Sequence, residues 1–477
     1  QPLLNKAYGI AQQPDGKILL AGYVLAGNTH FFHLSRALAD GSPDPDFGVN
    51  GAVETLVGTD AQCYAMVLQP DGKILVAGSA KMAASGTTDF AILRYRPDGL
   101  LDSTFSADGI QTVSLTNGDE TARSIILQKD GKILVGGTSL NSNGSLISLV
   151  RLNADGNLDS TFSGDGKTTL GIGTFFTECY AVSLQDDGKI VAVGAAKFGM
   201  ADDFAVARFL PDGSLDASFG VAGTVTTNLG SDADAANAVA IQPDGKILVA
   251  GTSGAMRDFS MARYLENGAL DPVFGNQGIE KTDFFGFDDI ANAVLLQSGG
   301  YILLGGYAYV TTLPKFALAR FDPSGKIDPN FGTNGLVVTD FNSSYDYGFP
   351  MAAQSDGKIL LGGYSFSNGH TAMAVARYLS DLNVGLFEND QPFLEKIYPN
   401  PVGESAVFSF QNEKTGRFSL QLIDAMGRTV ETFFSNKIIE KGGHSETLFF
   451  KKPISVGWYL LKMTGGEKEF SVKILKK

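Results

Sequence analysis

Short apolar segments alternate with polar turns along most of the chain, and the spacing of apolar residues within each segment is that of strands. One stretch illustrates the pattern: Ala238–Gln242 is small and apolar, Lys246–Thr252 is rich in Ile, Leu and Val, Phe259–Leu265 alternates apolar and polar residues, and Gly278–Asp283 adds a fourth segment. Successive strand residues point to opposite faces, so this alternation predicts strands, and a helical period is absent. The pattern therefore predicts four short strands.

This unit recurs seven times along the chain. Its first turn carries Asp-Gly-Lys, beginning at Asp15, Asp71, Asp130, Asp187, Asp244 and Asp356, with a degenerate copy at Ser298–Tyr301. The glycines of successive copies are 56, 59, 57, 57, 55 and 57 residues apart. A glycine adopts the positive φ that a tight turn needs. A fixed period of this length indicates a repeat architecture, and four strands per unit are typical of propeller blades.

A second constant turn, between the third and fourth strands, reads Leu-Asp-x-x-Phe-Gly-x-x-Gly. Its aspartates are Asp44, Asp102, Asp159, Asp216, Asp271 and Asp328, and its phenylalanines are Phe47, Phe105, Phe162, Phe219, Phe274 and Phe331. We expect each carboxylate to accept backbone N–H groups inside the turn. We expect each ring to fill the space between neighbouring blades. A calcium loop built on these carboxylates is the alternative.

Seven such units can bury their apolar faces by packing around a common axis. We therefore predict an all-β fold with a seven-bladed β-propeller over residues 1–390. The last blade must be tied to the first, because an open sheet edge invites aggregation. The seventh repeat lacks the second constant turn, so we predict that Asn383–Glu388 closes this blade through a short hairpin. A strand from Gln1–Asn5 is the alternative.

The two signatures together resemble the delta-60 repeat family of bacterial surface proteins. They read Gln-Pro-Asp-Gly-Lys-Ile-Leu-Val-Ala-Gly and Leu-Asp-x-x-Phe-Gly, and they recur in register over roughly residues 7–380. The resemblance implies a propeller and implies no particular activity.

The repeat ends near Asp390, and residues 391–477 differ in composition. From Glu395 onward the chain carries 13 Lys and Arg against 9 Asp and Glu, whereas the remainder carries 24 against 42. Six further strands are predicted, at Ala406–Gln411, Phe418–Asp424, Thr429–Phe434, Ser445–Phe450, Gly457–Met463 and Glu469–Leu475, with a hairpin turn at Gly427. Short strands in a segment of this length predict a small immunoglobulin-like antiparallel β-sandwich.

Several motifs of this segment resemble the type A sorting domain of the type IX secretion system. They are Tyr398-Pro399-Asn400-Pro401, Asp424-Ala425-Met426-Gly427-Arg428, Gly457-Trp458-Tyr459-Leu460 and a basic ending with Lys473, Lys476 and Lys477. The resemblance implies a secreted protein that crosses the periplasm and an outer-membrane translocon, is recognised by an outer-membrane shuttle barrel, and reaches the cell surface or the extracellular space. Cleavage and attachment to lipopolysaccharide commonly follow in this family. An ordinary immunoglobulin-like module is the alternative.

Variable positions of the repeat predict a binding surface. The connections between second and third strands, and between successive units, vary in length and sequence, and both lie on the rim opposite the constant turns. From the former we select His30, Lys81, Lys197, Arg257, Tyr309 and His370. Five positions before the repeated Gln, at the expected channel mouth, are Tyr8, Tyr64, Arg123, Tyr180, Asn237, Asn292 and Phe349. Such groups suit sugars or peptides, and the alternative is that they only seal the channel.

The remaining chemistry narrows the classes of function. The four histidines lack metal-ligand spacing, and nucleophile-elbow, phosphate-loop and dinucleotide motifs are missing. An acidic propeller repels nucleic acid. The acidic pairs Asp202–Asp203, Asp232 with Asp234, and Asp288–Asp289 are interpreted as solvated loop charge, with calcium binding or acid–base catalysis as alternatives. Cys63 and Cys179, two repeats apart, are expected to be buried free thiols.

We therefore expect a non-catalytic surface propeller that binds a glycan or a protein and needs no cofactor. One alternative is an extracellular polysaccharide or peptide hydrolase or lyase with carboxylates at the channel mouth. Another is a structural spacer or surface-layer component. Propellers host all three functions, so the fold alone does not choose among them.

Overall fold

The computed structural model describes residues 4–199, 201–230, 233–341, 345–367, 369–379, 396–398, 405–412, 415–424, 428–450, 457–465 and 468–476. The chain forms two compact units, Gln1–Leu386 and Phe387–Lys477. The domain boundary predicted at residue 390 lies outside the described residues. Within them, helix is confined to one 3-10 turn, η1 (Ser298–Gly300), and no helix there is long and apolar enough to cross a membrane.

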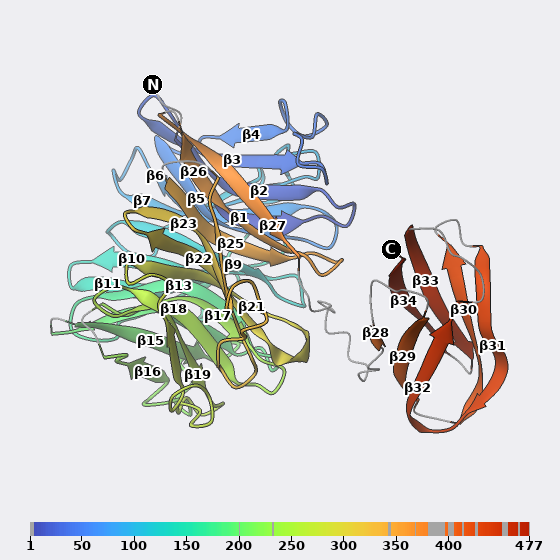
Figure 1. Cartoon of the computed structure of the whole chain (residues 1–477). Helices are drawn as coiled ribbons and strands as arrows, with labels where there is room; N and C mark the ends of the chain where they lie inside the picture. Colours follow the sequence, from blue (N-terminus) through green and yellow to red (C-terminus); the bar gives the residue numbers. More distant parts are fainter. Residues whose placement is uncertain are drawn as a thin grey trace. The chain divides into compact units, whose positions relative to one another are not determined.

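The first unit is built from repeated antiparallel sheets (Figure 1). Blades 1 to 3 contain β1 (Leu4–Gln12), β2 (Ile18–Ala26), β3 (Thr29–Ala37), β4 (Ala52–Thr55), β5 (Asp60–Leu68), β6 (Ile74–Lys81), β7 (Thr88–Tyr95), β8 (Ile110–Val113), β9 (Glu120–Leu127), β10 (Ile133–Asn141), β11 (Gly144–Leu152) and β12 (Lys167–Leu170). Each blade pairs its strands in chain order, as the alternating pattern predicts.

The later blades follow the same order. They contain β13 (Thr177–Leu184), β14 (Ile190–Phe198), β15 (Ala201–Phe209), β16 (Thr224–Thr227), β17 (Ala235–Ile241), β18 (Ile247–Ser253), β19 (Asp258–Tyr264), β20 (Ile279–Thr282), β21 (Asp289–Leu296), β22 (Ile302–Val310), β23 (Leu313–Phe321), β24 (Leu336–Thr339), β25 (Tyr345–Ala353), β26 (Ile359–Ser367) and β27 (His370–Tyr378). The four strands predicted in the fifth unit correspond to β17–β20. Among the described residues, blade 7 has three strands, β25–β27.

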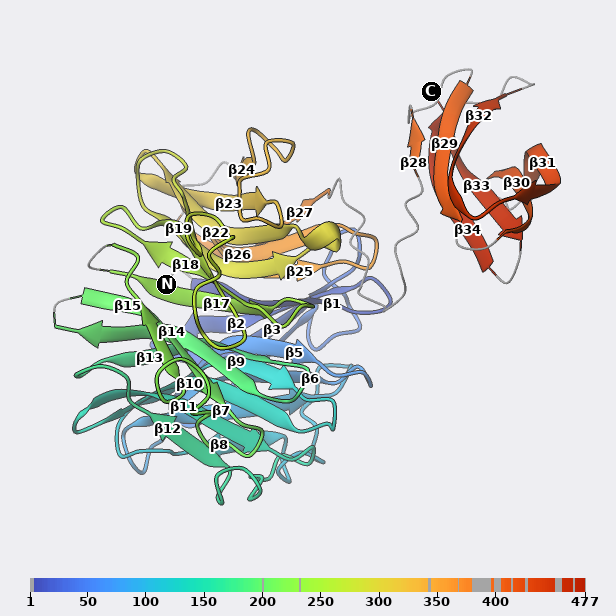
Figure 2. The ribbon, with the colours of Figure 1, turned by 90° about the horizontal axis from the view of Figure 1, so that it is seen from below.

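The blades close into a ring. The first strand of each blade contacts the first strands of both neighbouring blades, and β25 contacts β1. The orange strands of blade 7 accordingly lie beside the blue strands of blade 1 in Figures 1 and 2. Leu4 pairs in parallel with Thr371, and Asn5 N donates to Thr371 Oγ1 over 2.8 Å. The predicted seven-bladed β-propeller is confirmed.

The proposed closing strand Asn383–Glu388 lies outside the described residues, so that prediction stays a prediction. Of the alternative segment, Leu4 and Asn5 belong to β1, which is the inner strand of blade 1 and pairs with β2 from Leu4 to Gln12. Their contact with β27 resembles the parallel bridge from Asp202 to Ala233, which links blades 4 and 5.

The hydrophobic core lies between the faces of adjacent blades. One cluster joins Leu34 and Phe47 of blade 1 to Cys63 and Ile74 of blade 2, and all four side chains are fully buried. Cys63 and Cys179 are both free and buried, as predicted. Burial raises the pKa of both thiols, so they remain protonated and act as small apolar side chains.

In blades 1 to 6 the two constant turns meet on one rim, which we call the turn rim. Asp159 there accepts an N–H from Thr161 and pairs with the guanidinium of Arg151 at 2.6 Å and the ammonium of Lys132 at 2.9 Å. Lys132 comes from Asp-Gly-Lys and Asp159 from Leu-Asp-x-x-Phe, which explains why the two signatures recur together. The carboxylates therefore bind side-chain cations in addition to the predicted backbone N–H groups.

The same arginine position recurs eight residues before the aspartate in six blades. The pairs are Arg36–Asp44, Arg94–Asp102, Arg151–Asp159, Arg208–Asp216, Arg263–Asp271 and Arg320–Asp328, with Nε–Oδ2 distances of 2.6 to 2.9 Å. Each guanidinium also lies 4.2 to 4.8 Å from the centre of the phenylalanine ring of its own turn. Sequence reasoning missed this arginine.

The phenylalanines fill the joints between blades, as predicted. Phe105 of blade 2 packs against Gly156 of blade 3, where a Cβ would lie 2.8 Å from the ring and φ is +92°. Arginines bridge the same joints: Arg263 donates to the carbonyl of Pro323 in the next blade over 2.8 Å. Arg377 of blade 7 donates to the carbonyl of Ala39 in blade 1, also over 2.8 Å, so the joint that closes the ring repeats the contact between the others.

The second unit is the predicted antiparallel sandwich. One sheet has the order β28 (Lys396–Tyr398), β29 (Ser405–Asn412), β32 (Gly442–Phe449), and the other the order β31 (Thr429–Ile439), β30 (Gly416–Asp424), β33 (Gly457–Gly465), β34 (Lys468–Lys476). Phe408 and Leu448 of the first sheet pack with Leu420, Leu422 and Leu461 of the second in one core. All six predicted strands are present, and β28 is an addition.

Candidate functional site

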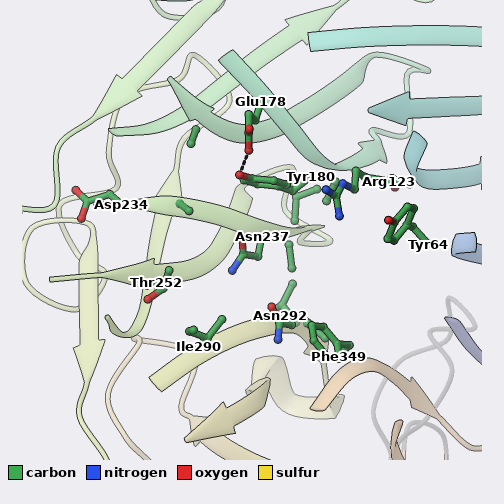
Figure 3. A pocket seen from close by; sticks show the side chains of 18 of the residues that line it. Tyr64, Arg123, Glu178, Tyr180, Asp234, Asn237, Thr252, Ile290, Asn292 and Phe349 are labelled. Atoms are coloured by element: carbon green, nitrogen blue, oxygen red, sulfur yellow. Dashed lines mark hydrogen bonds between the residues drawn. The ribbon is translucent and has the colours of Figure 1, made fainter. Parts of the chain in front are cut away.

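A cavity of about 790 Å³ lies at the centre of the ring, where the first strands of the blades converge. Every blade contributes the residue five positions before the repeated Gln, so the predicted channel-mouth set lines a single cavity: Tyr8, Tyr64, Arg123, Tyr180, Asn237, Asn292 and Phe349. Figure 3 shows several of these side chains converging from neighbouring strands.

A β-bulge places each of these side chains. The pairing of first and second strands skips one residue in the first strand, as between Ala236 and Ala238, which leaves Asn237 unpaired. The skips in the other blades fall at the equivalent positions and include Tyr8, Tyr64, Arg123, Tyr180, Asn292 and Phe349. A bulge turns a side chain away from the plane of the ladder, here into the cavity.

A repeated glycine makes the bulge possible. Opposite the bulge of blade 5, Gly251 lies so close that a Cβ there would be 1.9 Å from the carbonyl oxygen of Ala235. Equivalent glycines face the other bulges, namely Gly22, Gly78, Gly137, Gly194, Gly306 and Gly363. This is the last glycine of the Ile-Leu-Val-Ala-Gly signature. The signature therefore encodes the bulge, although its role was not recognised from the sequence.

One part of the cavity wall is polar and of mixed charge. Arg123, Lys197 and Arg257 line it together with Glu178 and Asp202. The hydroxyl of Tyr180 donates to the Glu178 carboxylate (dashed line in Figure 3), and Lys197 Nζ lies 4.0 Å from Asp202 Oδ1. Burial raises the pKa of Glu178, against the opposing charge of Arg123. Cations and carboxylates are intermixed, so this wall does not favour an ion of one sign.

Two asparagines bridge adjacent blades beside the charged groups. Asn237 Nδ2 donates to the carbonyl of Ala291 over 3.0 Å, and Asn292 Nδ2 donates to the carbonyl of Gly348 over 2.8 Å. These bonds fix the orientation of both amides at the cavity wall.

The other part of the wall, from blades 7, 1 and 2, is aromatic. The ring of Tyr8 lies 5.4 Å from that of Tyr64 and 4.8 Å from that of Phe349, and Phe349 stacks on Tyr364 at 5.7 Å. Arg123 joins the two parts, because its guanidinium lies 4.7 Å from the Tyr64 ring. Burial raises the pKa of Tyr64 to about 12, so its phenol remains neutral and can donate a hydrogen bond.

The residues selected from the variable loops separate into two groups. Lys197 and Arg257 line the cavity. The residues His30, Lys81, Tyr309 and His370 are not part of its lining. His30 Nδ1 lies 2.9 Å from Asp60 Oδ1, the hydroxyl of Tyr309 lies 3.5 Å from that of Tyr347, and Lys81 and His370 are exposed.

Sequence reasoning missed Glu178, and it interpreted Asp202 and Asp234 first as solvated loop charge, with calcium binding or acid–base catalysis as alternatives, whereas both line the cavity. Glu178 precedes Tyr180 by two positions, and Ala235 and Ile290, which also line the cavity, hold the equivalent positions before Asn237 and Asn292. Residues two positions apart in a strand lie on the same face of the sheet. The cavity-lining positions of Glu178, Ala235 and Ile290 could therefore have been inferred from those of Tyr180, Asn237 and Asn292.

Apart from Tyr398, which belongs to the three-stranded sheet, the described residues of the sorting motifs lie toward one end of the four-stranded sheet of the sandwich. Asp424 of β30 pairs with Tyr459 of β33, and Gly457 pairs with Lys476 of β34. Lys473 pairs with Leu460 in the same region, and Tyr398 ends β28. Pro399, Asn400, Pro401, Gly427 and Lys477 lie outside the described residues.

Comparison with known families gives two matches. A family described as "Domain of unknown function (DUF5122) beta-propeller" matches residues 13–47, 69–105, 128–162, 185–219, 242–274, 297–331 and 354–384. A family described as "Secretion system C-terminal sorting domain" matches residues 396–477. No curated protein matches the sequence.

Several solved structures show partial similarity. The polysaccharide lyase Uly1 has 11% identity and a TM-score of 0.45, with coverage of 79% of this chain and 90% of that chain. Chaetomium thermophilum Sqt1 bound to the N-terminus of the ribosomal protein L10 has 11% identity and a TM-score of 0.40, covering 80% and 97%. Penicillium chrysogenum alpha-L-arabinanase complexed with arabinobiose has 12% identity and a TM-score of 0.36, covering 80% and 94%. Similarity at this level carries no argument about activity.

Proposed function

The chain belongs to the DUF5122 β-propeller family and ends in a secretion system C-terminal sorting domain, and we propose that its propeller is a non-catalytic module that binds an extracellular glycan in the central cavity. The sorting domain directs export to the cell surface or the extracellular space. Recognition by an outer-membrane translocon and shuttle barrel, through the sorting motifs of the sandwich, is part of the proposal.

One observation carries the proposal: seven bulged residues of different chemistry converge on one cavity. If these residues only sealed the channel, the same apolar residue could occupy the position in every blade. The phenylalanines of the turn rim show such repetition. Instead the bulge positions hold Tyr, Tyr, Arg, Tyr, Asn, Asn and Phe in order around the ring.

The chemistry of the wall favours an uncharged, hydroxylated ligand. Aromatic rings such as Tyr64 pack against the C–H faces of a sugar, while the amides of Asn237 and Asn292 and the guanidinium of Arg123 can hydrogen-bond its hydroxyl groups. Cations and carboxylates alternate, so an ionic ligand gains no net attraction. A volume of about 790 Å³ lies within the usual range for small-molecule pockets and suits a short oligosaccharide end.

A hydrolase or lyase is the second candidate, and Glu178 is the observation that favours it. Its raised pKa in a central cavity is the property expected of a general acid. The hydrogen bond from Tyr180 is equally consistent with a structural role. A spacer or surface-layer component, the third function expected from the sequence, would bind no ligand in this cavity.

The test is a binding screen of the full-length protein on glycan and peptide arrays. Replacing Tyr64 and Tyr180 together by Ala should weaken binding of the selected glycan at least tenfold, because one ring is lost from each part of the wall. The matched control replaces the exposed rim residues Lys81 and His370, which lie outside the cavity lining, and should bind like the wild type.

Other results of the binding screen would contradict the proposed glycan site. Unchanged binding by the Tyr64→Ala, Tyr180→Ala protein would place the site outside the cavity, and selection of peptides would change the ligand class. Absence of any ligand would favour the spacer. Cleavage of the selected glycan by the wild type but not by Glu178→Gln would replace binding by catalysis.

A further inference from the structure

Three carboxylates meet at the joint between blades 5 and 6, on the same side of the propeller as the variable loops. They belong to Asp258 at the start of β19, Asp283 after β20 and Asp289 at the start of β21, and one oxygen of each lies within 4.8 Å of the others. Ile290, the residue after Asp289, lines the central cavity.

Asp289 is completely buried, and only one of its two oxygens has a hydrogen-bond partner. Oδ2 accepts the backbone N–H of Phe284 over 2.8 Å. Oδ1 is buried without a partner among the described residues. A buried carboxylate oxygen without a donor or cation costs free energy, so it requires an explanation.

The next joint of the ring supplies that explanation. Fifty-seven residues along the chain, one repeat later, the equivalent positions hold Lys315, Asp340 and Asp346. Asp346 accepts the N–H of Phe341, as Asp289 accepts that of Phe284. The ammonium of Lys315 lies 2.7 Å from Asp340 Oδ1 and 3.1 Å from Asp346 Oδ2. Here a cation is supplied by the chain itself.

At the joint between blades 5 and 6, Asp258 takes the place of that lysine, which removes one positive charge and adds a third negative one. The exposed Lys281 influences Asp258, but its ammonium donates to the carbonyl of Leu229 and makes no ion pair with these three carboxylates. Burial, together with Asp283 and Asp258, raises the pKa of Asp289 to about 7, which reflects the uncompensated charge.

The other joints carry fewer charges at these positions. Blades 2 and 3 place Asp89, Ser114 and Glu120 there, and blades 4 and 5 place Asp203, Asn228 and Asp234. At the latter joint, Asn228 Nδ2 donates to Asp203 Oδ1 over 2.8 Å. Among the described residues, three carboxylates come within reach of one ion only at the joint between blades 5 and 6.

We propose that Asp258, Asp283 and Asp289 bind one calcium ion, in the place that the ammonium of Lys315 takes at the next joint. Three carboxylates offer up to six oxygen ligands, which suits a hard cation of flexible coordination, and the set lacks the nitrogen or sulfur ligands that favour zinc. Asp289 N donates to the carbonyl of Arg257, a residue of the cavity wall, so the ion would also stiffen that wall.

The experiment uses the full-length protein after treatment with a chelator. Calorimetric titration with calcium chloride should reveal a site that depends on these residues, and saturating calcium should raise Tm by about 3 °C, since an ion that binds only the folded state stabilises it. Asp258→Lys restores the arrangement of the next joint. This variant should reach or exceed the Tm of the calcium-loaded wild type without calcium, and it should no longer respond to calcium.

Two further variants complete the test. Asp283→Asn removes a ligand at an exposed position, so it should fold and lose the calcium response even if Asp258→Lys does not fold. Asp89→Asn changes the blade 2 equivalent of Asp258 and should keep the full response. Absence of calcium binding by the wild type, or an unchanged response in Asp283→Asn, would overturn the proposal.

Discussion

The two rims of the propeller are built from the same repeat but are used differently. On the turn rim, six blades hold the same Arg–Asp pair and the same Phe ring, and charge is neutralised within each blade. On the opposite rim, equivalent positions change from joint to joint: Asp258 and Lys315 occupy the same place in successive blades. The difference separates the residues that hold the ring from those free to take on a function.

The largest effect should come from breaking one Arg–Asp pair of the turn rim. Asp159→Ala leaves the guanidinium of Arg151 buried without its anion, and we expect a loss of about 3–5 kcal/mol in the free energy of unfolding. Urea denaturation of the full chain measures it. Asp186→Ala is the control, since Asp186 is 98% exposed in its ion pair and its loss should change stability by less than about 0.5 kcal/mol. Equal losses of stability in the two variants would mean that the buried Arg151–Asp159 pair stabilises the fold no more than an exposed ion pair does.

A smaller effect is expected from the glycine that connects the scaffold to the cavity. Gly251→Ala places a Cβ against the carbonyl of Ala235, and we expect a loss of about 1–3 kcal/mol together with a shift of Asn237 at the cavity wall. Gly171→Ala is the matched control, because the nearest atom there is the flexible end of Leu146 at 3.2 Å. Thermal denaturation distinguishes them. A neutral Gly251→Ala would show that the bulge does not need a glycine opposite it.

The smallest effect concerns pH, and an aspartate of the turn rim and a glutamate of the cavity wall should respond with opposite sign. Burial alone would raise the pKa of Asp102, but hydrogen bonds from Thr104 and Lys73 and the charge of Arg94 hold it well below its usual range. The stabilisation from the ionised Asp102 is complete above the pKa that this group has in the unfolded chain, about 4. It is lost as the pH falls toward the lower pKa of the folded state. Asp102→Asn should therefore flatten the loss of stability between pH 5 and pH 2, by at most about 1.4 kcal/mol per pH unit.

Glu178 provides the opposite case, because its pKa is raised by burial in the cavity. Above the pKa of the folded state, the buried charge of Glu178 destabilises the folded protein. This destabilisation disappears as the pH falls toward the pKa that the group has in the unfolded chain, because the carboxylate becomes protonated. Glu178→Gln should therefore be more stable than the wild type at neutral pH, and the difference should shrink on acidification. Denaturation curves at pH 7 and pH 4 measure it, and a constant difference would contradict the raised pKa.

The sequence predicted much of the fold because local signals and the repeat agree. Asp-Gly-Lys fixes one turn, Leu-Asp-x-x-Phe fixes another, and their period sets the number of blades. The strands of the sandwich were readable from alternation and turn residues in the same way. The closing strand at Asn383–Glu388 stays a prediction, because these residues lie outside the described part of the chain.

The candidate site was predicted in part. Position within the repeat found all seven bulged residues, because equivalent positions in a ring face the same axis. It did not reveal that Arg123 reaches the ring of Tyr64, or that three of the four bulged aromatic residues lie together, since the latter requires the closed ring that places blade 7 beside blade 1. Arg151 and its equivalents were missed because one polar residue in an alternating strand resembles ordinary solvent exposure.

The bulge has a consequence for how such a protein can change over evolutionary time. The backbone needs a glycine such as Gly251 on the second strand, yet it sets no requirement on the side chain that is turned inward. Seven positions can therefore vary one at a time at little cost to folding, and each variant presents a new combination of groups to the same central space. Chains of this design can change the side chains around the central cavity while the framework of the ring stays unchanged.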